Sequence, residues 1–478
     1  MKKSICNMLC LSAIAMLAHS SFAASIEQVI VRQQWPWSTD IHVEYKIKDV
    51  THPTDIHVQA FNGNEPLDSA CLVPAMSGRR HGISKDGIGT IVIDPLKAFG
   101  TEEVALANFW VKLTVSDSTE DMDETLYKIF DLTDGTCKDV TRGELLDWKY
   151  GAIETDFGRI GKDYNTSLKD VLIWTGVTND IAYKTTKLVM RKIPAKGVET
   201  RIGRLECQSQ NEANSAIREV SFTNDYFMSV FELTEGQFLT LITNTVGTTL
   251  TVEGSDKMLF NRTPDRYLRP VNVPDFVVRS YLQTWPGPGS YGKGEFPNNA
   301  ASFIGNLRMQ TGIVGFDLPT EAVWEYACRA GTTNDFNSGL NYSNNAEFAH
   351  LARCSQNSKS GASGDNAYNS VAVYSLSASE GGTAVVGSYR PNAWGLYDMH
   401  GNLQEMCLDR WSEVASVLGG RDPWGPANDD DEADLNRVFK GGVYYLDGRF
   451  STSSYRTSSS GNNSKDPRIG IRICLTVF

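Results

Sequence analysis

The chain has 478 residues, of which 41% are hydrophobic and 10% aromatic, so it can bury the cores of two or three domains. Its formal net charge of −12 excludes a large basic surface and, with it, nucleic acid or an anionic membrane as a partner.

The N-terminal segment 1–23 has the plan of a secretory signal peptide. Two lysines precede an apolar run, and Ser21 and Ala23 are small residues at the two positions that define cleavage. The run is too short to span a bilayer, and no later stretch reaches the roughly 18 uninterrupted apolar residues of a transmembrane helix. We therefore expect an exported protein, secreted or periplasmic, without a membrane span.

Residues 24–140 have the pattern of short strands. The stretch IHVEYKIK, residues 41–48, alternates hydrophobic and polar side chains with the period of two of a half-buried strand. DIHVQAF, GTIVID, FWVKLTV and LYKIFDL follow, separated by turn-forming residues. This spacing predicts a small all-β sandwich, and the absence of clustered catalytic residue types favours a structural or adhesive module.

Cysteine usage fits an exported protein. Nine cysteines are present, and two of them leave with segment 1–23. Seven is an odd number, so at least one thiol stays free. Cys71 and Cys137 are the two cysteines of the N-terminal region, and we predict that they form a disulfide.

Residues 141–184 show no periodicity and are interpreted as a linker with some order. From residue 185 to 478, Gly, Trp, Asn and Ser are frequent and helical periods are few, which indicates an irregular α+β domain. The strongest helix signal is LPTEAVWEYACRAGT, where Thr320 caps the start, Glu321 suits the positive end of the helix dipole and Gly331 ends the helix. A second helix is expected in VPDFVVRSYLQTW.

Seven sequence blocks in order resemble one known family. They are LVMRKIPAKG (188–197), NDYFMSVFELTEGQF (224–238), RPVNVPDF (269–276), FDLPTEAVWEYACRAGT (316–332), VGSYRPNAWGLYDMHGNLQEMCLDRW (386–411), RVFKGGVYY (437–445) and PRIGIRICL (467–475). Together they resemble the formylglycine-generating enzyme, or sulfatase-modifying factor, family. The resemblance implies an irregular α+β fold related to C-type lectins.

The resemblance also implies a copper-dependent, oxygen-using oxidase that converts a sulfatase cysteine to formylglycine. The family holds copper with two cysteines, because soft Cu(I) prefers thiolates. Here the matching positions fall near Leu446 and Ser451, and residues 441–460 contain no cysteine. We therefore expect no bound copper and no catalytic residues of the family's kind. A sister branch that holds iron with three histidines is not favoured, because His350 and His400 are the two histidines of the domain.

The stretch PNAWGLYDMHGNLQEM places many ligand-type side chains on a turn. In the family one calcium site falls on this motif. Carried over, it implies the side chains of Asp398 and Glu405 and the backbone carbonyls of Gly401 and Leu403. Calcium is a hard cation that prefers such oxygen ligands.

The alternative is a turn that closes on its own hydrogen bonds, with Asp398 and Asn402 accepting backbone N–H groups. In either case the stretch is architectural, because no nucleophile and base are arranged in it. The Ser-rich stretch RFSTSSYRTSSSGNNS is interpreted as a solvated loop. The aromatic residues around it, next to Asn and Asp, are of the kind with which proteins hold sugars and peptides.

Two functions from different classes stay open. The first is an exported, non-catalytic binding or structural module with an unknown protein or glycan ligand. The second is a formylglycine-generating oxidoreductase that acts on a sulfatase cysteine through an unorthodox site. Copper content and thiol-dependent oxygen uptake distinguish the two.

Overall fold

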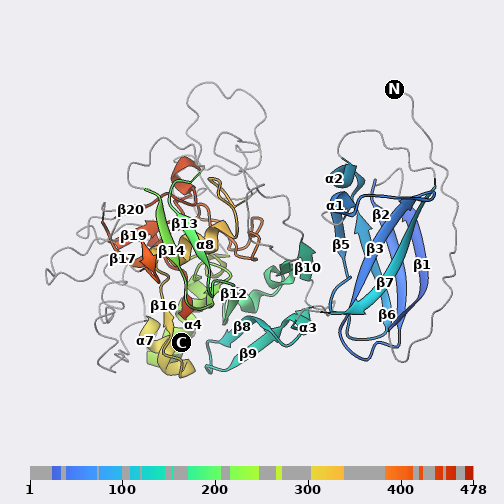
Figure 1. Ribbon diagram of the computed structural model, residues 1–478. Helices are drawn as coiled ribbons and strands as arrows, with labels where there is room; N and C mark the ends of the chain where they lie inside the picture. Colours follow the sequence, from blue (N-terminus) through green and yellow to red (C-terminus); the bar gives the residue numbers. More distant parts are fainter. Residues whose placement is uncertain are drawn as a thin grey trace. The chain divides into compact units, whose positions relative to one another are not determined.

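The computed structural model describes residues 24–33, 39–72, 75–99, 108–118, 121–145, 152–155, 171–205, 216–246, 265–271, 303–337, 383–412, 419–423, 437–444, 448–458 and 469–476. The chain divides into two compact units, one of residues 1–125 and 141–176 and the other of residues 126–140 and 177–478 (Figure 1). The predicted signal segment and the expected helix VPDFVVRSYLQTW lie outside the described residues.

The first unit contains a β-sandwich of two antiparallel sheets with the strand orders β1-β2-β6-β5 and β4-β3-β7. The strands are β1 (Ser25–Gln33), β2 (Ile41–Lys48), β3 (Thr54–Asn62), β4 (Glu65–Pro66), β5 (Met76–Gly78), β6 (Gly87–Ile93) and β7 (Phe109–Asp117). Strand β2 buries every second residue, as its alternation predicts, and both sheets contribute to one hydrophobic core. The predicted small all-β domain is confirmed.

Short elements complete the first unit. They are α1 (Ser69–Leu72), α2 (Pro95–Phe99), α3 (Arg142–Leu145) and the antiparallel pair of β10 (Ala152–Thr155) and β11 (Val171–Trp174). The segment 141–184, which the sequence indicates as a linker with some order, thus holds a helix, a strand pair and the 3-10 helices η3 (Thr175–Thr178) and η4 (Ile181–Lys184).

The stretch LYKIFDL lies in a different sheet from the one that the sequence suggests. It forms β8 (Thr125–Asp131), which is followed by β9 (Cys137–Thr141) and pairs with β12 of the second unit. The alternation of a strand indicates a buried face, but it does not say which sheet the strand joins. The predicted disulfide is wrong for the same reason: Cys71 lies in the first unit, Cys137 lies on β9, and both are free thiols.

A six-stranded sheet forms the centre of the second unit, in the order β16-β22-β15-β12-β8-β9. Its further strands are β12 (Lys187–Ile193), β15 (Tyr226–Ser229), β16 (Phe316–Asp317) and β22 (Cys474–Thr476). The last strand, β22, pairs with β15 on one side and β16 on the other. The sheet therefore joins segments from the beginning, middle and end of the unit.

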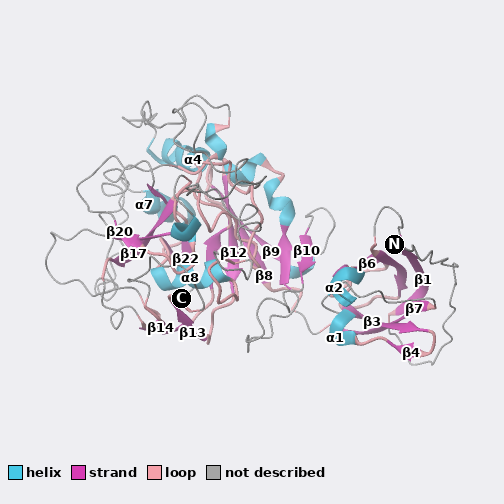
Figure 2. Ribbon diagram, turned by 90° about the horizontal axis from the view of Figure 1, so that it is seen from above, coloured by secondary structure: helices cyan, strands magenta, loops and turns pink. Residues whose placement is uncertain are grey.

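Two smaller sheets have the orders β13-β14-β18 and β20-β19-β17-β21. Their strands are β13 (Glu199–Ile202), β14 (Arg218–Ser221), β17 (Gln404–Arg410), β18 (Gly420–Arg421), β19 (Arg437–Lys440), β20 (Thr457–Ser458) and β21 (Ile469–Gly470), and 3-10 turns lie at η6 (Arg266–Leu268) and η9 (Gly448–Ser451). Strands and loops predominate over helices in this unit (Figure 2), which confirms the irregular α+β fold. Among the described residues, no helix is long and apolar enough to cross a membrane.

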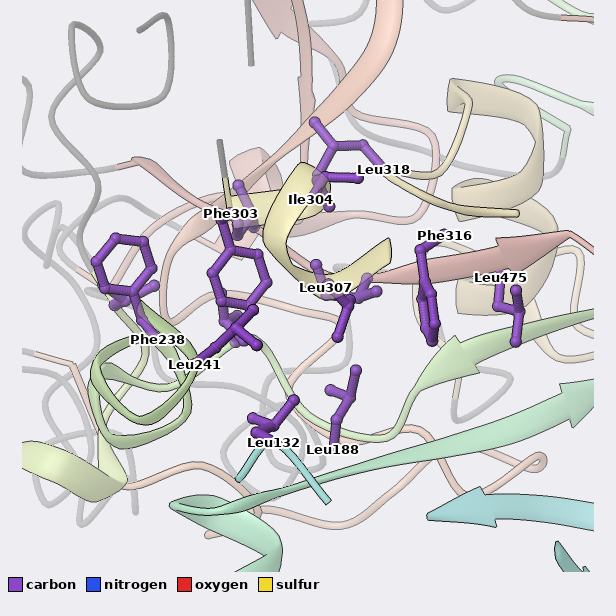
Figure 3. Packing of buried hydrophobic residues seen from close by; sticks show 14 of the residues in the cluster. Leu132, Leu188, Phe238, Leu241, Phe303, Ile304, Leu307, Phe316, Leu318 and Leu475 are labelled. Atoms are coloured by element: carbon purple, nitrogen blue, oxygen red, sulfur yellow. The ribbon is translucent and has the colours of Figure 1, made fainter. Parts of the chain in front are cut away.

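Two helices pack onto the core of the second unit, α4 (Glu235–Val246) and α7 (Phe303–Thr311). Figure 3 shows Phe238 and Leu241 of α4 beside Phe303 and Leu307 of α7. The rings of Phe238 and Phe303 stack with their centroids 5.5 Å apart. Leu475 of the last strand belongs to the same cluster, so the C-terminal residues help to close this core.

The predicted helix in LPTEAVWEYACRAGT is confirmed as α8 (Glu321–Arg329). The Thr320 hydroxyl accepts the Val323 N–H, as a cap residue should. Ala330 adopts the left-handed conformation with φ 43°, and Gly331 follows with φ 93°, so the helix ends where the glycine predicts.

Candidate functional site

The turn of residues 391–406 is buried and tied to distant segments. The Asn392 Oδ1 accepts the N–H groups of Trp394 and Leu396, which closes the first part of the turn. Its Nδ2 donates to the carbonyl of Ala327 at 2.7 Å, which fixes the turn to α8. The sequence thus uses one amide side chain both to shape the loop and to attach it.

Four residues of this turn have positive φ, namely Gly395 (80°), Asp398 (58°), Gly401 (82°) and Asn402 (60°). Glycine adopts this conformation freely, whereas Asp and Asn do so at a small cost that local hydrogen bonds offset. Here both side chains form hydrogen bonds to the segment that precedes the turn. The Asp398 Oδ2 accepts the Gly387 N–H at 2.6 Å, and the Asn402 Oδ1 accepts the Ala384 N–H at 2.8 Å. Asp398 and Asn402 thus accept backbone N–H groups, as in the alternative to calcium, but the donors lie in the segment before the turn rather than in the turn itself.

Glu405 lies on β17 with its carboxylate fully engaged. Arg472 donates through Nη2 to Oε1 at 2.7 Å and through Nε to Oε2 at 2.9 Å, and the Trp324 Nε1 donates to Oε2 at 2.5 Å. The same guanidinium donates to the backbone carbonyls of Ser229 and Tyr397. Arg472 is fully buried, so this pair fixes the turn between β15 and the C-terminal segment.

More carboxyl groups than cations lie around Arg472. Glu232 accepts hydrogen bonds from the Asn402 side chain and the Leu403 N–H, at 2.5 and 3.0 Å. Burial, together with the nearby Asp398 and Glu405 carboxylates, raises the pKa of Glu232 well above its ordinary value. Burial likewise raises the pKa of Asp398 to about 6.

The residues expected to hold calcium fit that ion in part. Asp398 fits, because its Oδ1 is buried and has no hydrogen-bond donor among the described residues. Glu405 does not fit in this arrangement, because Arg472 and Trp324 already direct hydrogen bonds at both of its oxygens. Gly401 and Leu403 lie on the same buried turn. Among the described residues, no group of three or more His, Cys, Asp and Glu side chains is suited to hold a metal ion.

The segment that resembles the family's copper loop is also buried. Ser451, Thr452, Ser453 and Ser454 have no exposed surface, so the interpretation of this stretch as a solvated loop is wrong for these four residues. Backbone hydrogen bonds to other segments explain the burial, such as that from the Ser453 N–H to the Asp335 carbonyl at 2.7 Å. The Ser451 Oγ has no hydrogen-bond partner among the described residues, and Leu446 lies outside them.

His400 and Cys328 lie beside this segment but do not form a catalytic pair. The His400 Nδ1 lies 2.7 Å from the Ser451 carbonyl, and its Nε2 accepts the Asn337 N–H at 3.1 Å. Both ring nitrogens are therefore occupied by backbone groups, and burial lowers the pKa of His400 to about 4. The Cys328 Sγ lies 3.8 Å from Nε2, and burial raises the pKa of this thiol to about 12. A neutral imidazole beside a protonated thiol is structural rather than nucleophilic.

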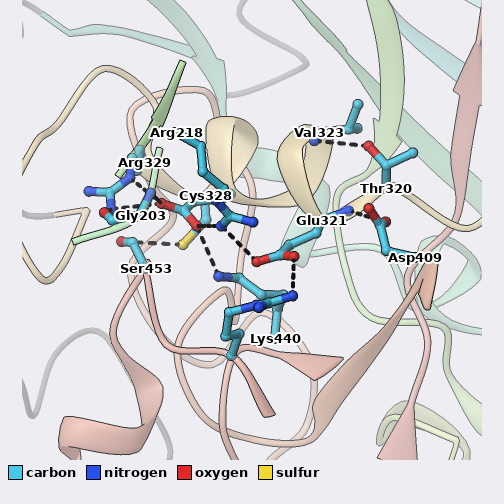
Figure 4. A network of polar contacts seen from close by, with 12 residues as sticks. Gly203, Arg218, Thr320, Glu321, Val323, Cys328, Arg329, Asp409, Lys440 and Ser453 are labelled. Carbon is cyan, nitrogen blue, oxygen red and sulfur yellow. Dashed lines mark hydrogen bonds and ion pairs between the residues drawn. The ribbon is translucent and has the colours of Figure 1, made fainter. Parts of the chain in front are cut away.

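A second polar network surrounds α8 (Figure 4). Its ion pairs join Glu321 to Arg218 and Arg456, and Glu325 to Arg329 and Lys440, at 2.8–3.0 Å. Burial alone would raise the pKa of Glu325, but the adjacent cations, Lys440 first, hold it at about 2. In the sequence, the signal for this network is the pair of Glu325 and Arg329, which lie four residues apart on the helix.

Comparison with known proteins identifies the second unit. Residues 189–477 match the profile of the family described as sulfatase-modifying factor enzyme 1-like domain. The chain belongs to this family. The sulfatase-modifying-factor domain accounts for the ordered sequence blocks, and the resemblance stated from the sequence is confirmed.

Curated relatives of the domain are named formylglycine-generating enzyme. The mouse protein is 32% identical over 155 residues, covering 32% of this chain and 36% of its own length. The Streptomyces coelicolor protein is 31% identical over 161 residues, covering 33% of this chain and 44% of its own. The chain thus matches less than half the length of these relatives.

Similar solved structures include Treponema denticola variable protein 1 and PvdO from Pseudomonas aeruginosa. They are 21% and 20% identical, with TM-scores of 0.39 and 0.41, and the matches cover 61% and 60% of this chain and 95% and 94% of theirs. The family membership rests on the sequence match rather than on these scores.

Proposed function

We propose that the sulfatase-modifying-factor domain of this chain is a non-catalytic binding or structural module of an exported protein. Ser451 is the observation that supports this most directly. The family resemblance puts a copper cysteine at this position, and the residue here is a buried serine. A serine hydroxyl is a hard, protonated group and a poor ligand for Cu(I).

Among the described residues, the thiols of the domain offer no ready substitute. Cys328, Cys407 and Cys474 are all buried, and burial raises the pKa of each thiol above its ordinary value. The thiolate, which is the form that binds copper, is therefore disfavoured at neutral pH. They lie on α8, β17 and β22. Cys207 and Cys354 lie outside the described residues.

The second candidate is a formylglycine-generating oxidoreductase. The names of the relatives and their sequence identity of about one third favour it. It needs a copper site that does not use the positions of Leu446 and Ser451. Its support is thus the family match, whereas the non-catalytic proposal is supported by the side chains at the two positions.

A peptide assay separates the two candidates. The purified protein is incubated with a sulfatase-type cysteine peptide, a thiol reductant and oxygen, with and without added copper, and the peptide is analysed by mass spectrometry. We expect an unchanged cysteine, while an active formylglycine-generating enzyme in the same buffer gives the aldehyde. Copper-dependent conversion by the wild-type chain that is lost on substituting a remaining cysteine would refute the proposal.

Export is the part of the proposal that depends on segment 1–23. Its lysines, apolar run and small residues support cleavage after Ala23. N-terminal sequencing of protein from the periplasm or medium is expected to begin at Ala24. Recovery of the uncleaved chain from the cytoplasm alone would contradict export.

A further inference from the structure

An apolar strip crosses the outer face of the β4-β3-β7 sheet in the sandwich. The register pairs Phe61 with Pro66 on one side and with Trp110 on the other. The neighbouring residues Ala60 and Val111 belong to the hydrophobic core. Since side chains alternate along a strand, Phe61 and Trp110 point away from that core.

Trp110 is fixed as a flat platform. Its ring stacks on Phe61 with the centroids 4.3 Å apart and 7° between the planes. Its Nε1 donates to the Gly63 carbonyl at 2.7 Å, in the turn between β3 and β4. The indole nevertheless remains 39% exposed. An aromatic side chain that is held rigid and keeps this much exposed surface loses little conformational entropy when a ligand covers it.

The residues beside the platform are polar, and one of them, Lys112, carries a positive charge. Gln59 pairs with Lys112 and His57 with Thr114, and these residues have the same outward orientation as Trp110. From His57 to Phe61 on β3 and from Trp110 to Thr114 on β7, no outward position is acidic. Lys112 is exposed. Lys112 is therefore the charged group beside the platform, and the acidic residues of the same sheet, Asp55, Glu65 and Asp117, lie outside these positions.

We propose that this face binds an acidic saccharide, with one pyranose ring on Trp110 and its carboxylate beside Lys112. The face of an indole is electrically negative and attracts the weakly positive C–H groups on one side of a sugar ring. Two residues along a strand span about 6.8 Å, which is the scale of one sugar ring with its carboxylate. Gln59 and His57 lie in the adjoining positions. The Gln59 Nε2 already donates to the Ala60 and Leu67 carbonyls, and the His57 Nε2 lies 2.8 Å from the Ser116 Oγ, so the Gln59 Oε1 and the His57 Nδ1 are the groups that would meet ring hydroxyls.

The size of the strip argues against a protein as the occupant. A stable protein–protein interface covers about 800 Å² on each partner, with 20–30 residues a side. Three apolar side chains in one row, bounded by polar residues, are far smaller than that. A short segment of an acidic glycan matches both the narrow apolar strip and the charge beside it.

Affinity electrophoresis of the full chain tests the proposal. Gels contain polygalacturonate as the acidic polymer or dextran as the neutral one, with a chelator so that calcium does not bridge acidic groups. We expect retardation by polygalacturonate and not by dextran. The chain is itself acidic, so non-specific ionic attraction to a polyanion does not produce this result.

Variants assign the binding to this face. Trp110→Ala should weaken retardation at least tenfold, and Lys112→Gln should weaken it and reduce its dependence on salt. Ile88→Ala, at a 73% exposed position on the other sheet, is the matched control and should behave as wild type. Lys112→Gln also serves if Trp110→Ala unfolds, because it changes an exposed side chain only.

Four results would overturn the proposal. They are no retardation of the wild type, equal retardation by dextran, retardation that survives Trp110→Ala in a folded protein, and retardation insensitive to Lys112→Gln. Sedimentation completes the test: if Trp110→Ala changes the oligomeric state and not the retardation, the face is a protein interface.

Discussion

Substitution of Arg472 by methionine should destabilise the sulfatase-modifying-factor domain strongly. Both Arg472 and Glu405 are almost completely inaccessible, at 0% and 1% side-chain exposure. Methionine keeps much of the volume but removes every hydrogen bond that Arg472 donates to Glu405 and to the carbonyls of Ser229, Val230 and Tyr397. Removing one partner of a buried ion pair costs about 3–5 kcal/mol, because the other charge stays buried and uncompensated.

The measurement is urea unfolding followed by near-ultraviolet circular dichroism, with thermal melting in parallel. At about 2 °C per kcal/mol in a large domain, the expected loss lowers the melting temperature by roughly 6–10 °C. Arg421→Met is the matched control, because Arg421 is 77% exposed and its substitution should change stability by less than about 0.5 kcal/mol.

A double-mutant cycle separates the charge from the packing. Glu405→Gln combined with Arg472→Met should cost less than the sum of the two single losses, because no charge is left unpaired. A loss below about 1 kcal/mol for Arg472→Met alone, or strictly additive losses, would refute the view that this pair holds the turn.

Four further predictions concern pH, calcium, copper and the sandwich. Burial raises the pKa of Asp409 to about 7, so between about pH 4 and pH 7 the folded state keeps a proton that the unfolded state has lost. The free energy of unfolding should therefore fall as pH rises through this range. Asp409→Asn should flatten that fall in urea titrations, and an unchanged slope would contradict the prediction. If calcium binds at Asp398, elemental analysis should find about one ion per chain, and removing the ion should lower the melting temperature. Asp398→Ala should abolish this shift. A wild-type protein that holds no metal and whose melting temperature does not change with chelator excludes the site. The double substitution Leu446→Cys and Ser451→Cys should create tight Cu(I) binding that neither single variant shows. The affinity is measured by competition with a copper chelator. Weak binding by the double variant would mean that the pocket geometry is lost. A fragment of residues 24–118 contains the whole sandwich core and should give a β-type far-ultraviolet spectrum with a cooperative melt, and a disordered spectrum would show that the unit needs more of the chain.

Local features of the fold followed from the sequence. The alternation in β2 and the cap, dipole and stop signals of α8 each depend on residues a few positions apart, and each was found where predicted. The sheet to which β8 belongs was not predictable, because its partner β12 lies about 60 residues further along the chain and the alternation pattern carries no partner information.

In the candidate site, too, local features were predictable from the sequence and long-range partners were not. The sequence marked Asp398 and Asn402 as turn residues that accept backbone N–H groups, and the structure contains those bonds. Nothing in the sequence indicated that Arg472, 67 residues from Glu405, donates hydrogen bonds to both carboxylate oxygens of Glu405. Nor did it indicate that Glu232, 170 residues from Asn402, accepts a hydrogen bond from the Asn402 side chain. Such partners depend on the tertiary fold, which brings the C-terminal segment and β15 to the same turn.

The place of β22 in the central sheet has a consequence for biosynthesis. This strand consists of residues 474–476, at the very end of the matched domain, and it lies between β15 and β16 inside the sheet. While the chain emerges from the ribosome, both neighbours lack their shared partner until residues 474–476 have been translated. The domain is therefore unable to complete its sheet during synthesis, and a long-range sheet of this kind is slow to form afterwards. The proposed export would use this delay, because the general secretion machinery threads a polypeptide across a membrane in its unfolded state.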